Sequence, residues 1–399
     1  MKNRNLVLSV AIIIIAAILR LYFVFIYPQV QIAGDALVYD ELGWNLAQGK
    51  GFVSKLGFPE IVCTPGYPFF LSIVYKAFGH SYASVKFFQI LLSLISMIII
   101  YLLAKSIFSQ KIAIIALSIS AFYPPFLSYN ALILTESLFT FFLVFYIYLL
   151  SIVMQKNSWK ITFLTGAVGG CAIFIKEEFI LLILGILLLA FLYFKEKFKH
   201  VLIIVLISLG VLAPWLVRNY NIFNKSILIS ALSGKTFWIS TYKEEWLEWK
   251  NDNEYLNSLT RGLSVVQQNE VLLKEGLRNI KEAPFLYAKF CLKRFLRLWV
   301  GSHSNTFYGL TGSFQHYFDL KDYIRLGIKS FLLILNTSLV ILGFIGFWVS
   351  VRLRPQKLPI LIIGLPVFIT TVVHFFLFST TRYQVPVMPF MIIFAASII

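Results

Sequence analysis

A short stretch near the start of the chain, QIAGDALVYDELGWNLAQGKGF at residues 31–52, gathers three carboxylates directly after an apolar run. Asp35, Asp40 and Glu41 lie within seven residues, although only 18 of the 399 residues are acidic. Asp35 follows Gly34 at a typical helix start, where its side chain can cap backbone N–H groups. The local pattern therefore leaves Asp35 open between a helix cap and a functional carboxylate. Asp40 and Glu41 are expected to be solvated charges at an exposed helix start.

A fourth carboxylate, Glu136 in LILTESLF, lies close to the outer end of an otherwise apolar helix. An ionisable side chain at that depth of a membrane is costly, and by default it is a hypothesis for a functional site. The alternative is a side chain that snorkels toward the outer surface. The pattern favours the functional interpretation.

The amino-acid composition indicates the environment in which these carboxylates lie. Hydrophobic residues make up 59% of the chain and charged residues only 13%. A soluble domain of this length cannot bury so much apolar surface, so most of the chain is expected to lie in a bilayer. The net charge of +17 would also suit a nucleic-acid-binding protein. However, the basic residues lie mainly at the ends of apolar runs, which favours a membrane protein with no nucleic-acid partner.

The apolar runs predict an all-α polytopic membrane protein with about ten transmembrane helices. The expected spans are residues 6–27, 86–105, 112–128, 131–154, 161–175, 178–194, 201–217, 327–350, 358–378 and 384–399. We expect the first span to be retained, because its apolar core is longer than that of a signal peptide and no small-residue cleavage site follows it.

Basic residues predict the orientation, because cytoplasmic loops are enriched in Lys and Arg. With the N-terminus in the cytoplasm, every short inside loop is basic, through Lys105, Lys111, Lys156, Lys160, Lys195, Lys197, Lys199, Arg352, Arg354 and Lys357. The long segments 28–85 and 219–326 then lie outside. We therefore expect an N-terminal transmembrane module at 1–218, a mainly helical extracytoplasmic segment at 219–326 and C-terminal transmembrane helices at 327–399.

Two amphipathic surface helices are expected in the first outside loop. The first runs from Asp35 to Gln48, with Asp35 and Tyr39 one turn apart on the same face. The second begins at the rigid turn that contains Pro65 and ends near Gly79.

Six motifs occur in an order that resembles the C-type (GT-C) integral-membrane glycosyltransferases. They are Gly34-Asp35 with Tyr39, LAQGKGF, TPGYPFF, LILTESLF, APWLVRNYNIF and TRYQVPVMPF. The resemblance covers essentially the whole chain, and it is greatest to bacterial relatives of protein O-mannosyltransferases and lipid A aminoarabinose transferases. It implies a GT-C-like fold and an inverting enzyme in the cytoplasmic membrane. Such an enzyme would move a sugar from a polyprenyl-phosphate carrier to an acceptor hydroxyl at the outer face.

The resemblance also implies roles for single residues. Asp35 would be the general base that takes a proton from the acceptor hydroxyl. Glu136 matches the second acidic position, where it would orient the acceptor or, together with Asp35, hold a divalent metal ion. Tyr39 and Tyr67 would position substrate.

Because the leaving group is a lipid phosphate, the resemblance further implies cations that stabilise its developing charge. Arg218, Arg382 and Lys176 lie at outer ends of the expected spans, and Tyr383 lies beside Arg382. Each of these cations has an alternative as an interfacial anchor, and Glu177 would be able to neutralise Lys176. The expected partners are the polyprenyl-phosphate sugar donor, membrane lipids and a glycan, lipid or protein acceptor.

Two other classes of membrane protein compete with this interpretation. A flippase or transporter of lipid-linked sugars would place charges near mid-depth and broken helices in matched halves of the chain. A polysaccharide polymerase or ligase would be expected to place its key residues in the larger outside segment. Neither pattern matches carboxylates and cations that gather at one boundary. The sequence leaves the sugar and the acceptor open.

Overall fold

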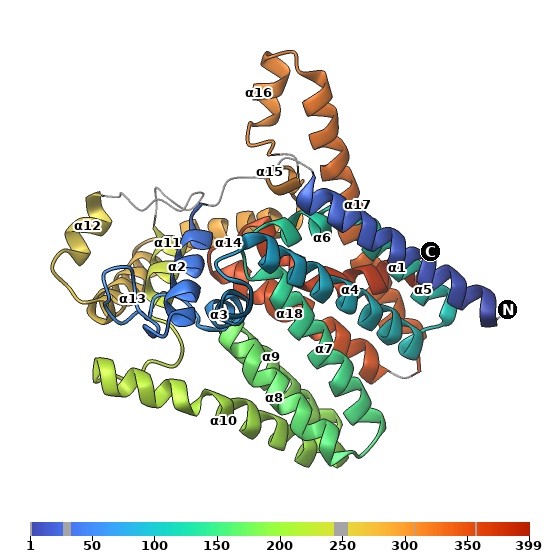
Figure 1. The fold of residues 1–399 in the computed structure, drawn as a ribbon, viewed down its shortest axis with the longest axis horizontal. Helices are drawn as coiled ribbons and strands as arrows, with labels where there is room; N and C mark the ends of the chain where they lie inside the picture. The colour runs from blue at the N-terminus through green and yellow to red at the C-terminus, as the bar shows by residue number, and fades with distance from the viewer. Residues whose placement is uncertain (1, 27–32, 243–253, 308, 356) are drawn as a thin grey trace.

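A computed structural model describes residues 2–26, 33–242, 254–307, 309–355 and 357–399 (Figure 1). Within these ranges the chain is helical apart from its connections, and the β pairing is limited to one isolated bridge between Val53 and Pro59. The prediction of an all-α protein is therefore confirmed.

The helices fall into three groups along the chain. The apolar bundle contains α1 (Lys2–Phe25), α4 (Tyr82–Ile107), α5 (Gln110–Phe122), α6 (Pro124–Ser128), η1 (Tyr129–Ala131), α7 (Glu136–Gln155), α8 (Trp159–Ile175), α9 (Phe179–Tyr193), η2 (Lys195–Lys197), α10 (Phe198–Phe223), α17 (Tyr323–Leu353), α18 (Lys357–Phe376), η3 (Thr381–Val387) and α19 (Met388–Ala396). The first loop contains α2 (Asp35–Ala47) and α3 (Gly66–Phe78). Between α10 and α17 lie α11 (Ser233–Thr241), α12 (Glu254–Thr260), α13 (Val265–Glu282), α14 (Pro284–Trp299), α15 (Ser304–Phe307) and α16 (Phe314–Asp319).

Six described helices are long and apolar enough to cross a membrane, namely α1, α4, α7, α10, α17 and α18. The pair formed by α5 with α6 and η1 would make a seventh span, bent by 57°. Helices α8 and α9 are apolar but shorter, and α19 has nine residues. The multi-pass helical architecture is thus confirmed, whereas a total of ten spans remains a prediction.

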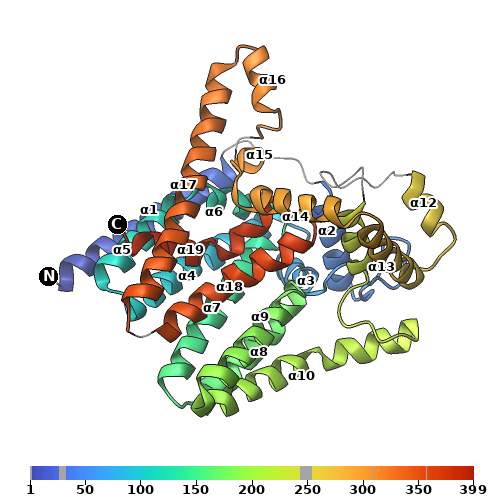
Figure 2. The ribbon, with the colours of Figure 1, turned by 180° about the vertical axis from the view of Figure 1, so that it is seen from behind.

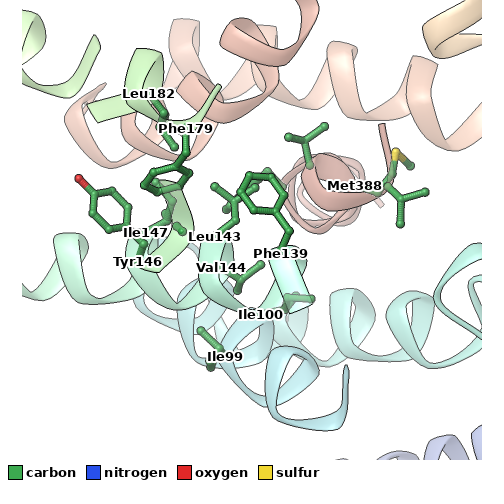
Figure 3. Packing of buried hydrophobic residues seen from close by; sticks show 14 of the residues in the cluster. Ile99, Ile100, Phe139, Leu143, Val144, Tyr146, Ile147, Phe179, Leu182 and Met388 are labelled. Atoms are coloured by element: carbon green, nitrogen blue, oxygen red, sulfur yellow. The ribbon is translucent and has the colours of Figure 1, made fainter. Parts of the chain in front are cut away.

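Helix α7 lies at the centre of the largest apolar core (Figure 3). In its most apolar window 67% of the residues are buried, the highest share among the six candidate spans. Its side chains Leu143 and Ile147 belong to the same cluster as Ile100 of α4, Leu182 of α9 and Met388 of α19. Burial of this kind holds the first residue of α7, which carries a carboxylate, in a rigid surrounding.

Helices α8 and α10 pack closely because α8 presents small residues to its neighbour. A Cβ atom on Gly166 would lie 2.7 Å from Cβ of Ile207, and one on Gly170 would lie 2.5 Å from Cβ of Val211. Small residues that let two backbones approach are the usual means of helix packing in membranes, where the hydrophobic effect between helices is weak.

A sharp break separates α5 from α6, and a buried arginine stabilises it. Pro124 starts α6, so the last carbonyls of α5 have no helical partner. Arg20 of α1 is fully buried and donates from Nη2 to the carbonyl of Ser120 and from Nη1 to that of Ala121. Its Nε donates to Oγ of Ser93 in α4. The guanidinium thus joins α1, α4 and the end of α5.

In the first loop, the prediction that Asp40 is a solvated charge is wrong. Asp40 is 9% exposed, and its carboxylate accepts hydrogen bonds from the hydroxyls of Tyr75 (2.6 Å) and Tyr82 (2.7 Å). It also lies 2.7 Å from Nε2 of His80. The reason is tertiary, because α3 and the start of α4 cover this face of α2. Glu41 is half-buried rather than fully solvated and accepts from the backbone N–H of Lys55.

The start of α2 also differs from the prediction. The residue before the helix is Gly34, with a φ of 59°, and Asp35 is the first helical residue rather than a side-chain cap. The left-handed backbone at this position suits glycine. The end of α2 and the bounds of α3, which stops before Gly79, agree with the prediction. Their position on a membrane surface remains a prediction.

The described part of the segment at 219–326 is mainly helical, as predicted. Helix α13 begins with a capping box formed by Ser264 and Gln267, and Pro284 begins the next helix. The helical spacing of KEEWLEWKNDNEYLNSL also predicts a helix at residues 243–259, which lie largely outside the described residues, and α12 covers the end of that stretch.

Four connections lie at the same end of the bundle, namely α4–α5, α7–α8, α9–α10 and α17–α18 (Figures 1 and 2). Arg354 joins two of them by donating to the carbonyl of Ile107. These are the connections that hold the basic residues of the expected inside loops. The side of the membrane on which they lie remains a prediction.

Candidate active site

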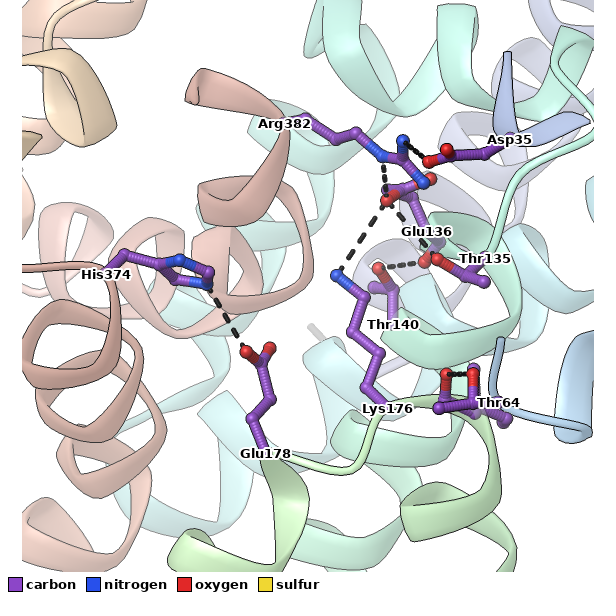
Figure 4. Close-up of polar contacts among 10 residues, drawn as sticks. Asp35, Thr64, Thr135, Glu136, Thr140, Lys176, Glu178, His374 and Arg382 are labelled. Carbon is purple, nitrogen blue, oxygen red and sulfur yellow. Dashed lines mark hydrogen bonds and ion pairs between the residues drawn. The ribbon is translucent and has the colours of Figure 1, made fainter. Parts of the chain in front are cut away.

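Asp35, Glu136 and Arg382 meet at the opposite end of the bundle, with the Arg382 guanidinium between the two carboxylates (Figure 4). Arg382 Nη1 donates to Oδ2 of Asp35 at 2.7 Å, and Nε donates to Oε1 of Glu136 at 2.5 Å. Both are charge-assisted hydrogen bonds, which are short and stronger than neutral ones. The structure therefore brings together three of the residues for which the sequence predicted chemistry.

Three helix boundaries place these side chains. Asp35 is the first residue of α2 and Glu136 is the first residue of α7. Arg382 lies in η3, the short 3₁₀ helix between α18 and α19. Because both carboxylates begin helices, each lies next to the partial positive charge of a helix N-terminus.

Lys176, at the C-terminal end of α8, is the fourth charge of the site. Its Nζ lies 3.8 Å from Oε1 of Glu136, and 5.3 Å and 5.1 Å from the ring centroids of Phe139 and Tyr383. Nζ is buried and has no hydrogen-bond acceptor among the described residues. Glu177 does not neutralise it, because that carboxylate accepts instead from the hydroxyl of Ser230.

The two carboxylates differ in access to solvent. The side chain of Glu136 is completely buried, whereas that of Asp35 is 59% exposed. Of these two, only Asp35 can therefore contact a substrate that enters from outside. Glu136 acts on its neighbours by balancing the buried charges of Arg382 and Lys176.

A second polar group adjoins the site and includes a residue that the sequence analysis missed. The rings of Tyr383 and His374 are stacked, with centroids 4.2 Å apart, and His374 Nε2 lies 3.4 Å from a carboxylate oxygen of Glu178. Burial raises the pKa of Tyr383 to about 12, so its hydroxyl stays protonated. The sequence signal for Glu178 was the pair of acids that follows Lys176, of which it is the second.

His303 and Gln384 form another buried pair behind Arg382. The Gln384 amide donates to Nε2 of His303 at 2.8 Å. Burial lowers the pKa of His303 to about 3, so the ring is neutral and can accept this bond. The pair holds η3 against the connection that precedes α15.

Tyr39 and Tyr67, the two tyrosines expected to position substrate, lie in contact with each other. The rings of Tyr39 and Tyr67 meet edge to face, with centroids 5.3 Å apart. Tyr39 is half-buried, and its pKa is raised by burial, with Arg382 lowering it and Asp35 raising it through their charges. Tyr67 is fully buried and donates to the side chain of Gln89. Tyr39 is thus near the charged cluster, and Tyr67 supports it from the core.

Arg218 is held against the first loop rather than in the charged cluster. Its guanidinium donates to the backbone carbonyls of Glu60 (3.0 Å) and Phe52 (3.1 Å). It also lies over the ring of Trp215, with 4.7 Å to the centroid. These contacts fix the loop that follows α2, and a direct role in phosphate binding remains a prediction.

The first loop is also attached to the end of α8, which carries Lys176. The Thr64 hydroxyl donates to the carbonyl of Ile175 at 2.9 Å. A Cβ atom on Gly66 would lie 2.6 Å from the backbone of Phe174, so only glycine fits at this contact. Attachment at both Thr64 and Gly66 places the loop with Asp35 and the α8 end with Lys176 in one rigid unit.

The arrangement does not fit a divalent ion held jointly by Asp35 and Glu136. The Arg382 guanidinium occupies the space between the two carboxylates and bonds to both. Among the described residues no group of three or more His, Cys, Asp or Glu side chains forms a metal-binding arrangement.

Comparisons with known proteins agree with this description. Residues 62–217, less than half of the chain, match the model of the family described as dolichyl-phosphate-mannose-protein mannosyltransferase. No curated protein matches the chain.

Solved structures match over almost the whole chain. The Archaeoglobus fulgidus oligosaccharyltransferase AglB, in complex with an inhibitory peptide and a dolichol-phosphate, is 14% identical with a TM-score of 0.57, over 98% of this chain and 50% of AglB. ArnT from Cupriavidus metallidurans, bound to undecaprenyl phosphate, is 14% identical with a TM-score of 0.56, over 98% of this chain and 59% of ArnT. The chain thus spans about half the length of AglB. It shares the fold of these proteins, and the resemblance to C-type membrane glycosyltransferases is confirmed.

Proposed function

We propose that the protein is an inverting glycosyltransferase that moves a sugar from a polyprenyl-phosphate carrier to an acceptor hydroxyl. The observation that carries this proposal is an exposed carboxylate, Asp35, next to two cations, Arg382 and Lys176, that have unused hydrogen-bond donors. A base beside an anion-binding site is the minimum that such a transfer requires.

In the proposed step, Asp35 accepts the proton of the acceptor hydroxyl while the hydroxyl oxygen attacks the anomeric carbon. The bond between that carbon and the phosphate oxygen breaks, and its electron pair stays on the phosphate. Attack from the face opposite the leaving group inverts the anomeric centre. In the described part of the chain only Oδ2 of Asp35 is engaged by Arg382, so Oδ1 can take the proton.

The leaving phosphate would be bound by Arg382, and the buried ammonium of Lys176 would add a positive charge close to it. Nη2 of Arg382 donates to no described residue, and Nζ of Lys176 has no acceptor among them. Guanidinium groups match phosphate by bidentate hydrogen bonds, and an ammonium adds a point charge. Because both cations are largely shielded from water, their effect on the developing charge is stronger than it would be at an exposed site.

Glu136 has the role of a positioning residue in this proposal. It is buried, and it orients Arg382 through Nε while leaving Nη2 free. The earlier interpretation in which it touches the acceptor requires an accessible side chain, which Glu136 lacks. Tyr39, half-buried beside Asp35, is better placed to contact the sugar or the acceptor.

The site would lie at the outer face of the cytoplasmic membrane. In support of this location, the basic connections gather at the other end of the bundle, and basic connections are typical of the cytoplasmic side. A donor carried in the membrane and an acceptor presented from outside would then meet at the loop that contains α2.

The test supplies purified protein with a panel of polyprenyl-phosphate sugars and measures release of the free lipid phosphate together with the sugar product. Asp35→Asn is the matched inactive variant, and Asp40→Asn is the control in the same helix. Release that needs Asp35 and an acceptor supports the transferase. Movement of intact donor across a vesicle membrane without cleavage, unaffected by Asp35→Asn, would favour a flippase instead.

A further inference from the structure

A groove of about 500 Å³ lies at the basic end of the bundle, far along the helices from the charged cluster. Three chain segments form its walls. They are the end of α7 (Ser151, Met154, Gln155), the end of α9 with the residue after it (Tyr193, Phe194), and the start of α18 together with Pro355 (Pro355, Lys357–Pro359, Leu361–Ile363). Most of these side chains are apolar, and the proposed transfer reaction uses none of them.

Each of the three walls has a lysine that lines the groove or directly follows a lining residue in the chain, and we call these three lysines the mouth of the groove. Lys357 lines it directly, Lys156 follows Gln155 of the α7 wall, and Lys195 follows Phe194 of the α9 wall. All three are exposed, and in the described part of the chain no carboxylate pairs with them. The neighbouring acidic residue, Glu196, is also exposed, which leaves the mouth with a net positive charge.

We propose that this groove binds an anionic phospholipid, with an acyl chain between α7, α9 and α18 and the phosphate among Lys156, Lys195 and Lys357. Apolar walls alone would accept any lipid chain, but a cationic mouth on all three sides selects a negatively charged headgroup. Basic pockets between transmembrane helices are the usual sites for such headgroups. The exposed aromatic ring of Tyr193 at the rim suits the boundary between headgroup and chain.

The occupant is a lipid of the bilayer rather than a soluble anion, because the groove continues along the apolar surface of the helices. Next to Tyr193, Phe191 and Leu192 of α9 are 59% and 54% exposed. A soluble phosphate would use only the lysines and leave the apolar walls in contact with water. A phospholipid fills both parts of the site.

The test compares lipid retention in nanodiscs made from phosphatidylcholine with and without phosphatidylglycerol, using native mass spectrometry of the purified chain. The wild-type protein should retain phosphatidylglycerol in preference to phosphatidylcholine. Each lysine near a membrane surface contributes about 1 kcal/mol to such binding, so each Lys→Gln change should weaken retention roughly fivefold. The variant with Lys156, Lys195 and Lys357 all changed to Gln should lose on the order of 100-fold.

A matched control changes three lysines at the same end of the bundle that do not border the groove, Lys105, Lys111 and Lys160, to Gln. This control should keep its preference for phosphatidylglycerol. A second variant, Met154→Trp, leaves the lysines in place and narrows the groove, and it should lose retention of both lipids. Thermal unfolding in phosphatidylcholine alone shows that each variant is folded.

Three results would overturn the proposal. The first is an equal loss in the control triple variant, which would mean a diffuse charge effect. The second is a loss of thermal stability of the same size in both lipids, which would mean that the lysines only stabilise the C-terminal ends of α7 and α9. The third, in nanodiscs that also contain a polyprenyl phosphate, is retention of that lipid in place of phosphatidylglycerol. None of these readouts depends on transferase activity.

Discussion

Two of the carboxylates of α2, the exposed Asp35 and the buried Asp40, have opposite surroundings, and the same substitution at each should have opposite effects. Asp35→Asn should abolish sugar transfer and leave the protein folded. Asp40→Asn should leave the transfer rate of the folded protein near normal and lower its stability. The pair distinguishes a catalytic carboxylate from a structural one within six residues of the same helix.

The magnitudes follow from the contacts. Asp35 is 59% exposed, so loss of its pair with Arg382 should cost no more than about 1 kcal/mol of stability. Removal of a general base typically lowers the rate by about 10²–10⁴. Asp40 accepts from three groups, the hydroxyls of Tyr75 and Tyr82 and the ring of His80. If each charged hydrogen bond becomes a neutral one at a loss of about 1 kcal/mol, the total is about 3 kcal/mol.

The assay measures release of lipid phosphate per folded molecule and, in the same detergent, the free energy of unfolding. Normal turnover in Asp35→Asn would refute the assignment of the base, and Asp40→Asn as stable as wild type would refute the burial argument. A loss of both rate and stability in Asp35→Asn would show that its pair with Arg382 maintains the fold.

Three further predictions use the same preparations. Arg382→Ala should weaken binding of polyprenyl phosphate by about 1.5–3 kcal/mol, measured by tryptophan fluorescence titration. Arg218→Ala should instead mainly increase proteolysis of the first loop. Equal affinities in Arg382→Ala and wild type would refute the phosphate-binding role of Arg382. In a background without native cysteines, an impermeant thiol reagent should label Lys55→Cys in intact cells and Lys160→Cys only after permeabilisation, and the reverse pattern would invert the topology. Burial lowers the pKa of His303 to about 3, so the neutral ring contributes stability that is complete above the unfolded pKa near 6.5 and is lost as the pH falls toward 3. His303→Gln should therefore show a smaller fall in unfolding temperature over that range, and identical pH curves would contradict the assignment.

Motif order was enough to select Asp35, Glu136 and Arg382 as candidates, and the structure brings these three side chains together. However, the partners of Arg382 lie 347 and 246 residues away in the chain, and no local pattern reports which residues meet across such separations. The same motif order could not show that Arg218 bonds to loop carbonyls instead of joining the cluster.

The prediction for Asp40 failed for a related reason. Helical spacing tells which residues of α2 share a face, but it does not tell which face later elements cover. Tyr75 and Tyr82, which bury Asp40, come 35 and 42 residues later, from α3 and the start of α4. Long apolar helices such as α4 and α17 were predicted well, because their signal is contained in the apolar run itself.

The contact between Arg20 and the broken helix has a consequence for biogenesis. During synthesis α1 is inserted before its partners exist, and an isolated arginine within an apolar helix costs up to about 2.5–3.5 kcal/mol in the bilayer. The carbonyls that satisfy it belong to Ser120 and Ala121, which are made 100 and 101 residues later. The first helix therefore reaches its stable place only when α5 has been translated. Until then the Arg20 guanidinium has to be solvated by water or by the insertion machinery. Insertion of α1 into the membrane and its packing against α5 are therefore separated by the synthesis of the three helices between them, α2, α3 and α4.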